Sequence, residues 1–319
     1  AYLCGNEALP PLLFCAHMDT VQPARGKRTV LELDGRIRSA GESVLGADDV
    51  SAIAAILEAA QTLAENGAPH RGVELLLTIS EERYGTGAAA FDYSRIRAKE
   101  AYVPDYDGAH GQAVVAAPSI IGFRAEITGK ASHAGFAPEL GVSAIAAAAR
   151  AIAGLRLGRI TPDLTMNIGT ISGGLSTNIV PDSCAAAGEI RGYEHDEALE
   201  QLAKAEDAFQ TACDEAGAKL RFSSKCFLCA YRIPEDAAVV ARYFRVCGAR
   251  GFPTEAVRTF GGSDNNALTE HGISGIVIAS AMHACHTRSE YTSIEELSQL
   301  AQIVADLMRD RDCDVSSNG

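Results

Sequence analysis

Imidazole and carboxylate side chains gather at five places along this sequence, each just after a strand-like apolar segment. Histidine nitrogens and carboxylate oxygens are the donors that Zn²⁺, Mn²⁺ and Co²⁺ take in hydrolytic sites. Any one such pair is more often a turn or a helix cap than a set of metal ligands, whereas the joint pattern favours a metal centre. The pairs are His17 with Asp19, Asp48 with Asp49, Glu81 with Glu82, Asp105 with Asp107, and His283 with His286.

The stretch FCAHMDTV runs apolar into His17 and places Asp19 two residues later. Side chains at i and i+2 of an extended strand point the same way, so the two should lie together. His17 is then either a metal ligand oriented by Asp19, or one member of a hydrogen-bonded pair at a strand end.

Two cations about 3.5 to 4 Å apart could together be bound by the imidazole and carboxylate groups of these pairs. One would take His17 and Asp105, the other Glu82 and His286, and Asp48 would bridge them. A water bound between two such ions loses a proton near neutral pH and becomes a strong nucleophile.

The adjacent acids Glu81 and Glu82 can have different functions, because neighbouring side chains after a strand point in different directions. Glu82 can bind metal while Glu81 faces the water, as a general base that later returns the proton to a leaving amine. The alternative is a solvated acidic pair before the turn RYGTG.

The elements that must position these residues alternate between strands and helices. Such alternation predicts an α/β fold with a mostly parallel sheet covered on both faces, and ligands bind beyond the carboxyl ends of its strands. The predicted strands lie at 12–16, 73–80, 101–103 and 273–280, with a helix over 50–67.

A segment at 117–227 has a different rhythm, βαββαβ, which is the ferredoxin-like pattern. We therefore expect a lid domain over 117–227, inserted into a catalytic domain formed by 1–116 and 228–319.

Composition narrows the function classes. A charge of −13, from 41 acidic and 28 basic residues, argues against a nucleic-acid partner. The apolar runs are too short or interrupted for a membrane span. Nine cysteines, an odd number in a chain of 319 residues, favour free thiols in the cytoplasm. Because Ala1 stands close to the first strand, we expect part of the natural N-terminus to be missing.

Eight motifs, in order along nearly the whole chain, resemble the M20 metallopeptidases, most closely their tripeptidase or peptidase T-like branch. They are HMDTV, LGADD, SEERYGTGA, VPDYDG, GKASHAG, GGLSTNIVPD, GGSDNN and HACHTRSEY. The resemblance implies a zinc-exopeptidase-like catalytic domain with two Zn²⁺ ions, Mn²⁺ and Co²⁺ being alternatives, and an inserted ferredoxin-like lid.

The resemblance also implies roles for individual residues. Asp48 would bridge the ions, Glu81 would be the general base, Asp19 would orient His17, and His283 would not be a ligand. The implied metal ligands are His17, Asp48, Glu82, Asp105 and His286.

In the lid, the family pattern makes His133 a stabiliser of the oxyanion, supplied by the neighbouring subunit in dimeric members. Asn178 and Arg191 either contact substrate or hold the lid together. Gly262 and Ser263 fall in the substrate-lining loop.

The predicted function is a co-catalytic zinc exopeptidase that removes the N-terminal residue of short peptides, with a possible homodimer through the lid. One alternative keeps the same machinery for N-acyl amino acids or C-terminal peptide bonds. Another is a non-catalytic binding homologue, against which the retained Glu81 and all five ligands argue.

Overall fold

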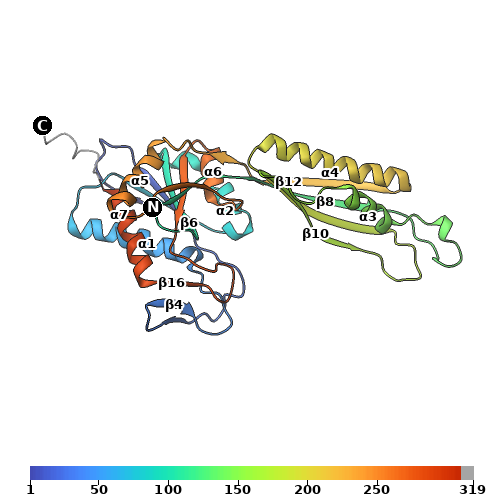
Figure 1. Ribbon diagram of the computed structural model, residues 1–319, viewed down its shortest axis with the longest axis horizontal. Helices are drawn as coiled ribbons and strands as arrows, with labels where there is room; N and C mark the ends of the chain where they lie inside the picture. The colour runs from blue at the N-terminus through green and yellow to red at the C-terminus, as the bar shows by residue number, and fades with distance from the viewer. Residues whose placement is uncertain (310–319) are drawn as a thin grey trace. The chain divides into compact units, whose positions relative to one another are not determined.

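The computed structural model describes residues 1–309 and divides into two compact units (Figure 1). The first runs over Ala1–Ala117 and resumes at Tyr231, and the second is Pro118–Ala230. The part of the predicted catalytic domain beyond residue 309 lies outside the described residues.

An eight-stranded sheet forms the centre of the first unit. Its order is β1-β5-β2-β6-β15-β7-β13, with β14 pairing parallel to β7. Neighbours among β5, β2, β6 and β15 are parallel, so the predicted mostly parallel α/β sheet is confirmed. The strands are β1 (Tyr2–Leu3), β2 (Leu12–His17), β5 (Val73–Thr78), β6 (Glu100–Tyr106), β7 (Gln112–Ala117), β13 (Tyr231–Arg232), β14 (Glu255–Arg258) and β15 (Ser274–Ala279).

Both faces of this sheet are covered, which explains why the central strands are almost continuously apolar. Along β2, Phe14 joins the core on one face with helices α1 (Ala47–Asn66), α5 (Ala238–Ala249) and α7 (Ile294–Met308) (Figure 1). Leu13 and Cys15 join the core on the other face, beneath α6 (Asp264–Glu270). The alternation along β2 follows from the period of two in a strand.

Several small elements of the first unit were not predicted. A three-stranded sheet has the order β16-β4-β3. The turn after β5 is the 3₁₀ helix η1, followed by the short α2. The bounds are β3 (Thr29–Leu31), β4 (Arg36–Ser39), η1 (Glu81–Arg83), α2 (Thr86–Ala89), η2 (Tyr93–Arg95) and β16 (Tyr291–Ser293). Their strands are three or four residues long, too short for hydrophobic periodicity to reveal.

The second unit has the predicted βαββαβ order with one extra short strand. Its antiparallel sheet runs β12-β8-β11-β10-β9, and the first four strands have the ferredoxin-like arrangement. The elements are β8 (Ser119–Thr128), η3 (Pro138–Leu140), α3 (Ala144–Gly154), β9 (Gly158–Thr161), β10 (Leu164–Gly173), β11 (Ser183–Gly192), α4 (His195–Ala216) and β12 (Lys219–Leu228).

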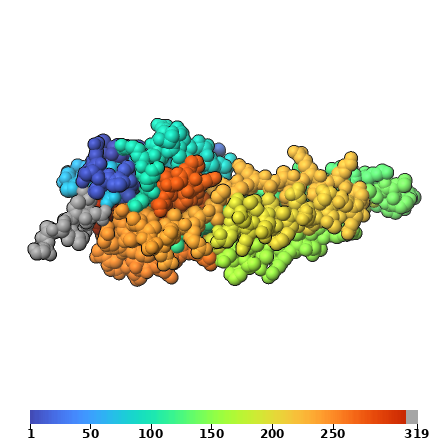
Figure 2. Space-filling model, turned by 90° about the horizontal axis from the view of Figure 1, so that it is seen from above, coloured from blue at the N-terminus to red at the C-terminus, as the bar shows by residue number. Residues whose placement is uncertain are grey.

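The two helices of the second unit cover one face of its sheet. Phe209 of α4 and Ala147 of α3 lie in a core with Phe123 of β8. The outer face of α4, yellow in Figure 2, is exposed. Within residues 1–309, no helix of either unit has both the length and the apolar composition needed to cross a bilayer.

Candidate active site

Residues from five separate segments meet at the carboxyl ends of the parallel strands, where open α/β sheets place their ligands. His17 is the last residue of β2, Glu82 lies in η1 directly after β5, and Asp105 is the next-to-last residue of β6. Asp48 lies in the irregular first turn of α1, and His286 in the loop between β15 and β16. Asp105 was expected after its strand rather than within it.

Asp48 contacts two imidazoles with its two oxygens. Its Oδ1 lies 2.9 Å from Nε2 of His17, and its Oδ2 lies 3.1 Å from Nε2 of His286. The side chains of Asp48 and His17 are 9% and 2% exposed, so their contact is shielded from water, whereas the side chain of His286 is 54% exposed. A carboxylate that presents one oxygen to each of two imidazoles has the arrangement of a bridging ligand.

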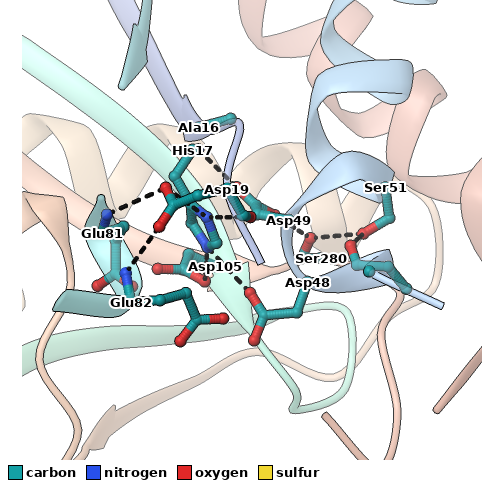
Figure 3. A network of polar contacts seen from close by, with 12 residues as sticks. Ala16, His17, Asp19, Asp48, Asp49, Ser51, Glu81, Glu82, Asp105 and Ser280 are labelled. Atoms are coloured by element: carbon teal, nitrogen blue, oxygen red, sulfur yellow. Dashed lines mark hydrogen bonds and ion pairs between the residues drawn. The ribbon is translucent and has the colours of Figure 1, made fainter. Parts of the chain in front are cut away.

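The other two carboxylates complete one group on each side of Asp48. Oδ1 of Asp105 lies 3.8 Å from Nε2 of His17 (Figure 3). Oε2 of Glu82 lies 3.0 Å from Nε2 of His286. The second oxygen of Glu82, Oε1, is buried and has no hydrogen-bond partner among the described residues. A buried carboxylate oxygen without a donor fits a site that holds a cation.

Asp19 is engaged through both its backbone and its side chain. Its carbonyl lies 3.0 Å from Nδ1 of His17, whereas its carboxylate is 3.6 Å from that nitrogen. The carboxylate accepts the backbone N–H groups of Glu81 at 3.1 Å and Glu82 at 3.3 Å. The backbone of Asp19 therefore orients the imidazole, and its side chain fixes the turn that carries the acidic pair.

The supporting roles of two acids, Asp49 and Glu290, were not identified from the sequence. Asp49 is fully buried, accepts the N–H of His17 at 3.3 Å and receives the hydroxyl of Ser280 at 2.9 Å (Figure 3). Glu290 accepts the N–H groups of Gly46 at 2.6 Å and Asp48 at 3.0 Å. The adjacency of two aspartates was visible, but no local pattern joins Glu290 to residues more than 240 positions away.

The crowding of acids gives the site an unusual electrostatic character. Burial, reinforced by Asp105, raises the pKa of Glu81 to about 10. Burial and Asp48 raise the pKa of Glu82 to about 7, and burial raises that of Asp105 to about 6. Burial alone would lower the pKa of His17, but its contacts with Asp105 and Asp48 raise it above the usual range. These shifts express a buried excess of negative charge that bound cations would neutralise.

A cavity of about 250 Å³ opens beside these acids and includes the predicted substrate-loop residues. Gly262 and Ser263 line it, and Ser263 caps α6 by accepting the N–H of Asn265 at 3.2 Å. The cavity also carries an acid outside the candidate ligand set, Asp107. The lining residues are Asp48, Glu81, Glu82, Asp105, Tyr106, Asp107, Val114, Thr259, Gly261, Gly262, Ser263, Val277, Met282, Cys285 and His286.

His133 and Asn178 lie on neighbouring segments of the second unit. The N–H of Ala134 donates to the carbonyl of Asn178 at 3.0 Å. Nδ1 of His133 accepts the N–H groups of Gly135 at 3.1 Å and Phe136 at 3.2 Å. Because Nδ1 is the acceptor, the neutral ring carries its proton on Nε2, which is then a hydrogen-bond donor.

The remaining candidates have contacts of their own. Arg191, on β11, donates from Nε to Glu189 of the same strand at 2.6 Å. Nε2 of His283 lies 2.8 Å from Oε1 of Glu296, and its ring stacks on Tyr291, so the contacts of this side chain are with residues outside the candidate ligand set.

Two family models match the sequence. One, described as "Peptidase dimerisation domain", covers residues 115–220, and the other, "Peptidase family M28", covers residues 3–121. The fold, the site and these matches define the protein as a metal-dependent peptidase.

Similarity to individual proteins extends over almost the whole chain. The uncharacterised protein YqjE of Bacillus subtilis strain 168 is 35% identical over 97% of this chain and 83% of its own. The crystal structure of aminopeptidase PepT from Bacillus cereus ATCC 10987 has 37% identity and a TM-score of 0.89, covering 96% of this chain and 82% of that one. A tripeptidase structure from Staphylococcus aureus has 31% identity and a TM-score of 0.93, covering 97% and 82%. This chain belongs to the M20 family of metallopeptidases, in its peptidase T-like branch, so the resemblance read from the motifs is confirmed.

Proposed function

We propose that this protein is a co-catalytic di-zinc aminopeptidase that removes the N-terminal residue of short peptides, tripeptides in particular. The contact of each Asp48 oxygen with a different imidazole carries the proposal, because it places two groups of donors on either side of one carboxylate. The family membership supports hydrolysis of peptides as the reaction.

In this proposal His17 and Asp105 hold one ion, Glu82 and His286 hold the other, and Asp48 bridges them. Zn²⁺ is preferred because imidazole and carboxylate donors suit it, and Mn²⁺ or Co²⁺ can occupy the same donors. When bound, the ions supply Lewis acidity and lower the pKa of water toward neutrality.

Glu81 is the proposed general base. It lines the same cavity as the ligands, and its backbone N–H is fixed by Asp19. Its carboxylate takes a proton from the attacking water and then gives that proton to the nitrogen of the leaving amine, so the side chain ends each turnover in its starting state. Bound cations would bring its raised pKa down to the range this task needs.

The second unit is proposed to serve as a lid and to mediate a homodimer. The match to a dimerisation domain supports the dimer. The hydrogen-bond donor on Nε2 of His133 supports the lid. Nε2–H of His133 is a donor suited to the oxyanion that forms when the scissile carbonyl is attacked. Asn178 and Arg191 are assigned to the substrate or to the integrity of the lid, and Gly262 and Ser263 to the wall of the cavity.

Asp107 favours an aminopeptidase over the other activities. Its exposed carboxylate lines the cavity, outside the proposed ligand set, and offers an ion pair to the protonated amine of a peptide. The competing activity is a carboxypeptidase, since a protein named as a probable carboxypeptidase from Aspergillus clavatus is 30% identical over 59% of this chain and 49% of its own. N-acyl amino acids are the other competing substrates.

We also propose a cytoplasmic location, with neither nucleic acid nor a membrane as partner. The acidic balance supports the first exclusion. The eight cysteines within residues 1–309 are all free thiols, which fits a reducing compartment.

The test is a substrate panel combined with elemental analysis of the loaded protein. We expect two ions per chain at the proposed centre and hydrolysis of a free-amine tripeptide with release of its first residue. A chain that hydrolyses an N-acetylated amino acid, or releases the last residue of the tripeptide, would instead have one of the competing activities. Zero or one ion after careful loading would contradict the two-ion centre.

A further inference from the structure

A second group of potential metal ligands lies in the Pro118–Ala230 unit. His195, Cys226 and Cys229 each offer one ligand atom, and all three atoms lie within 4.8 Å of one another. The odd number of cysteines, which favoured free thiols, did not indicate this group, although Cys226 and Cys229 form a Cys-X-X-Cys pair in the sequence. Such spacing is common where two thiolates share one metal ion.

Three different elements supply the group. His195 is the first residue of α4, Cys226 lies near the end of β12, and Cys229 follows that strand. The two sulfur atoms are 3.8 Å apart, and Sγ of Cys226 donates to the carbonyl of Leu228 at 3.2 Å. Cys226 is exposed and the other two are half-buried, so a metal ion can reach the group from solvent.

The imidazole of His195 is positioned by a hydrogen bond to one of its two ring nitrogens, as the ring of a metal-ligating histidine usually is. Its Nδ1 lies 2.9 Å from Oγ of Ser119, a fully buried hydroxyl that also accepts the N–H of Ala230 at 2.8 Å. When Nδ1–H donates to this oxygen, the lone pair is left on Nε2, which is the nitrogen free to bind metal. A ligand histidine that donates its other N–H to a fixed acceptor is the usual supporting arrangement.

We propose that His195, Cys226 and Cys229 form a Zn²⁺ site, with water in the fourth position. Two thiolates and one imidazole are a soft donor set that zinc accepts in tetrahedral geometry. Binding replaces the two thiol protons, which are released to solvent. Ser119 and Ala230 stand where the chain enters and leaves the second unit, so the bound ion would fasten α4 to that point.

This site is independent of the proposed catalytic centre, whose donors include no thiolate. The full-length protein, reduced and loaded with Co²⁺, should therefore show a thiolate-to-cobalt charge-transfer absorption in the near ultraviolet that the proposed catalytic donors cannot produce. Loaded with Zn²⁺, it should hold one more ion per chain than the Cys226→Ser/Cys229→Ser variant. Ser119→Ala should weaken binding of this extra ion about 10-fold to 100-fold.

The matched control is Cys285→Ser, because Cys285 is the cysteine that lines the catalytic cavity. This variant should keep both the absorption and the extra ion. Loss of the absorption in Cys285→Ser, or its absence in the wild-type protein, would overturn the proposal. So would a disulfide between Cys226 and Cys229 that persists in the reduced preparation and is found by mass spectrometry, since it would make the pair a redox couple instead.

Discussion

Asp48 and Glu81 divide the proposed chemistry between them at the scale of single residues. Asp48 presents one oxygen to each of two imidazoles, whereas Glu81 lines the cavity with a pKa raised to about 10. One is placed to hold cations and the other to exchange a proton. The two roles are separable by substitution.

Glu81→Gln keeps the size of the side chain and removes its capacity to accept a proton. We expect kcat on a tripeptide to fall about 10²-fold to 10⁴-fold, with the same number of ions bound as in the unsubstituted protein. Steady-state kinetics and elemental analysis of the same preparation check both parts. Unchanged turnover would show that another group is the base.

Asp107→Asn tests how the free amine is recognised. Removing one ion pair made by an exposed carboxylate should raise KM for a free-amine tripeptide about twofold to fivefold. The control is an N-acetylated tripeptide, which has no charged amine. It should be an equally poor substrate for the Asp107→Asn variant and for the unsubstituted protein. A KM unaffected by the substitution would place the amine elsewhere.

At the scale of elements, the beginning of α1 is the part of the site that depends most on distant support. Asp48 and Asp49 have non-helical backbone angles there, and Gly46 before them is left-handed. Glu290, from the loop before β16, accepts the N–H groups of Gly46 and Asp48 that a regular helix start would leave to caps or water. The shape of this turn is therefore set by a long-range contact.

Glu290→Gln should loosen that turn, because the amide offers one acceptor oxygen in place of two. We expect a loss of about 2 kcal/mol in the free energy of unfolding and weaker binding of the bridged ions. Urea unfolding of the chelator-treated protein measures the first effect, and zinc titration measures the second. Glu295→Gln, an exposed change on α7, is the matched control. Equal behaviour of the two variants would contradict the role given to Glu290.

The sequence predicted the elements whose patterning is local. β2 is a fully buried run that ends at His17, and β5 is a mostly buried run that ends three residues before Glu81, so the acids and the histidine beside them were recognisable. The three-residue strand β16 and the support from Asp49 and Glu290 could not be predicted, because each depends on contacts between distant segments. The Asp19 carbonyl illustrates the same limit, since sequence spacing indicates proximity but not which atom makes the contact.

At the scale of the whole molecule, the buried charge makes stability depend on pH and on metal. A carboxyl whose pKa is higher in the folded state binds more protons there, so raising the pH favours unfolding. For Glu82 this stabilisation is present below about pH 4.5 and lost as the pH rises through about 7, and for Glu81 it is lost toward about 10. The raised pKa of His17 acts with the same sign.

The metal-free protein should therefore have a Tm that falls between about pH 5 and pH 8. The zinc-loaded protein should lose this dependence, because cations replace the protons. Differential scanning calorimetry of chelator-treated and reloaded samples checks the prediction. A metal-free Tm that rises over this interval would show that the acidic cluster does not govern the pH response.

The strand pairing of Ala117 with Tyr231 shows where the second unit is inserted into the sheet of the first. The residues on either side of the second unit are antiparallel partners in the first, so 113 residues depart from and return to adjacent positions of one sheet. A short hairpin turn would join the same two strands. The host sheet thus requires only that the two ends of an insert lie side by side, and a domain could be gained, exchanged or lost there without disturbing the strands that carry the candidate ligands.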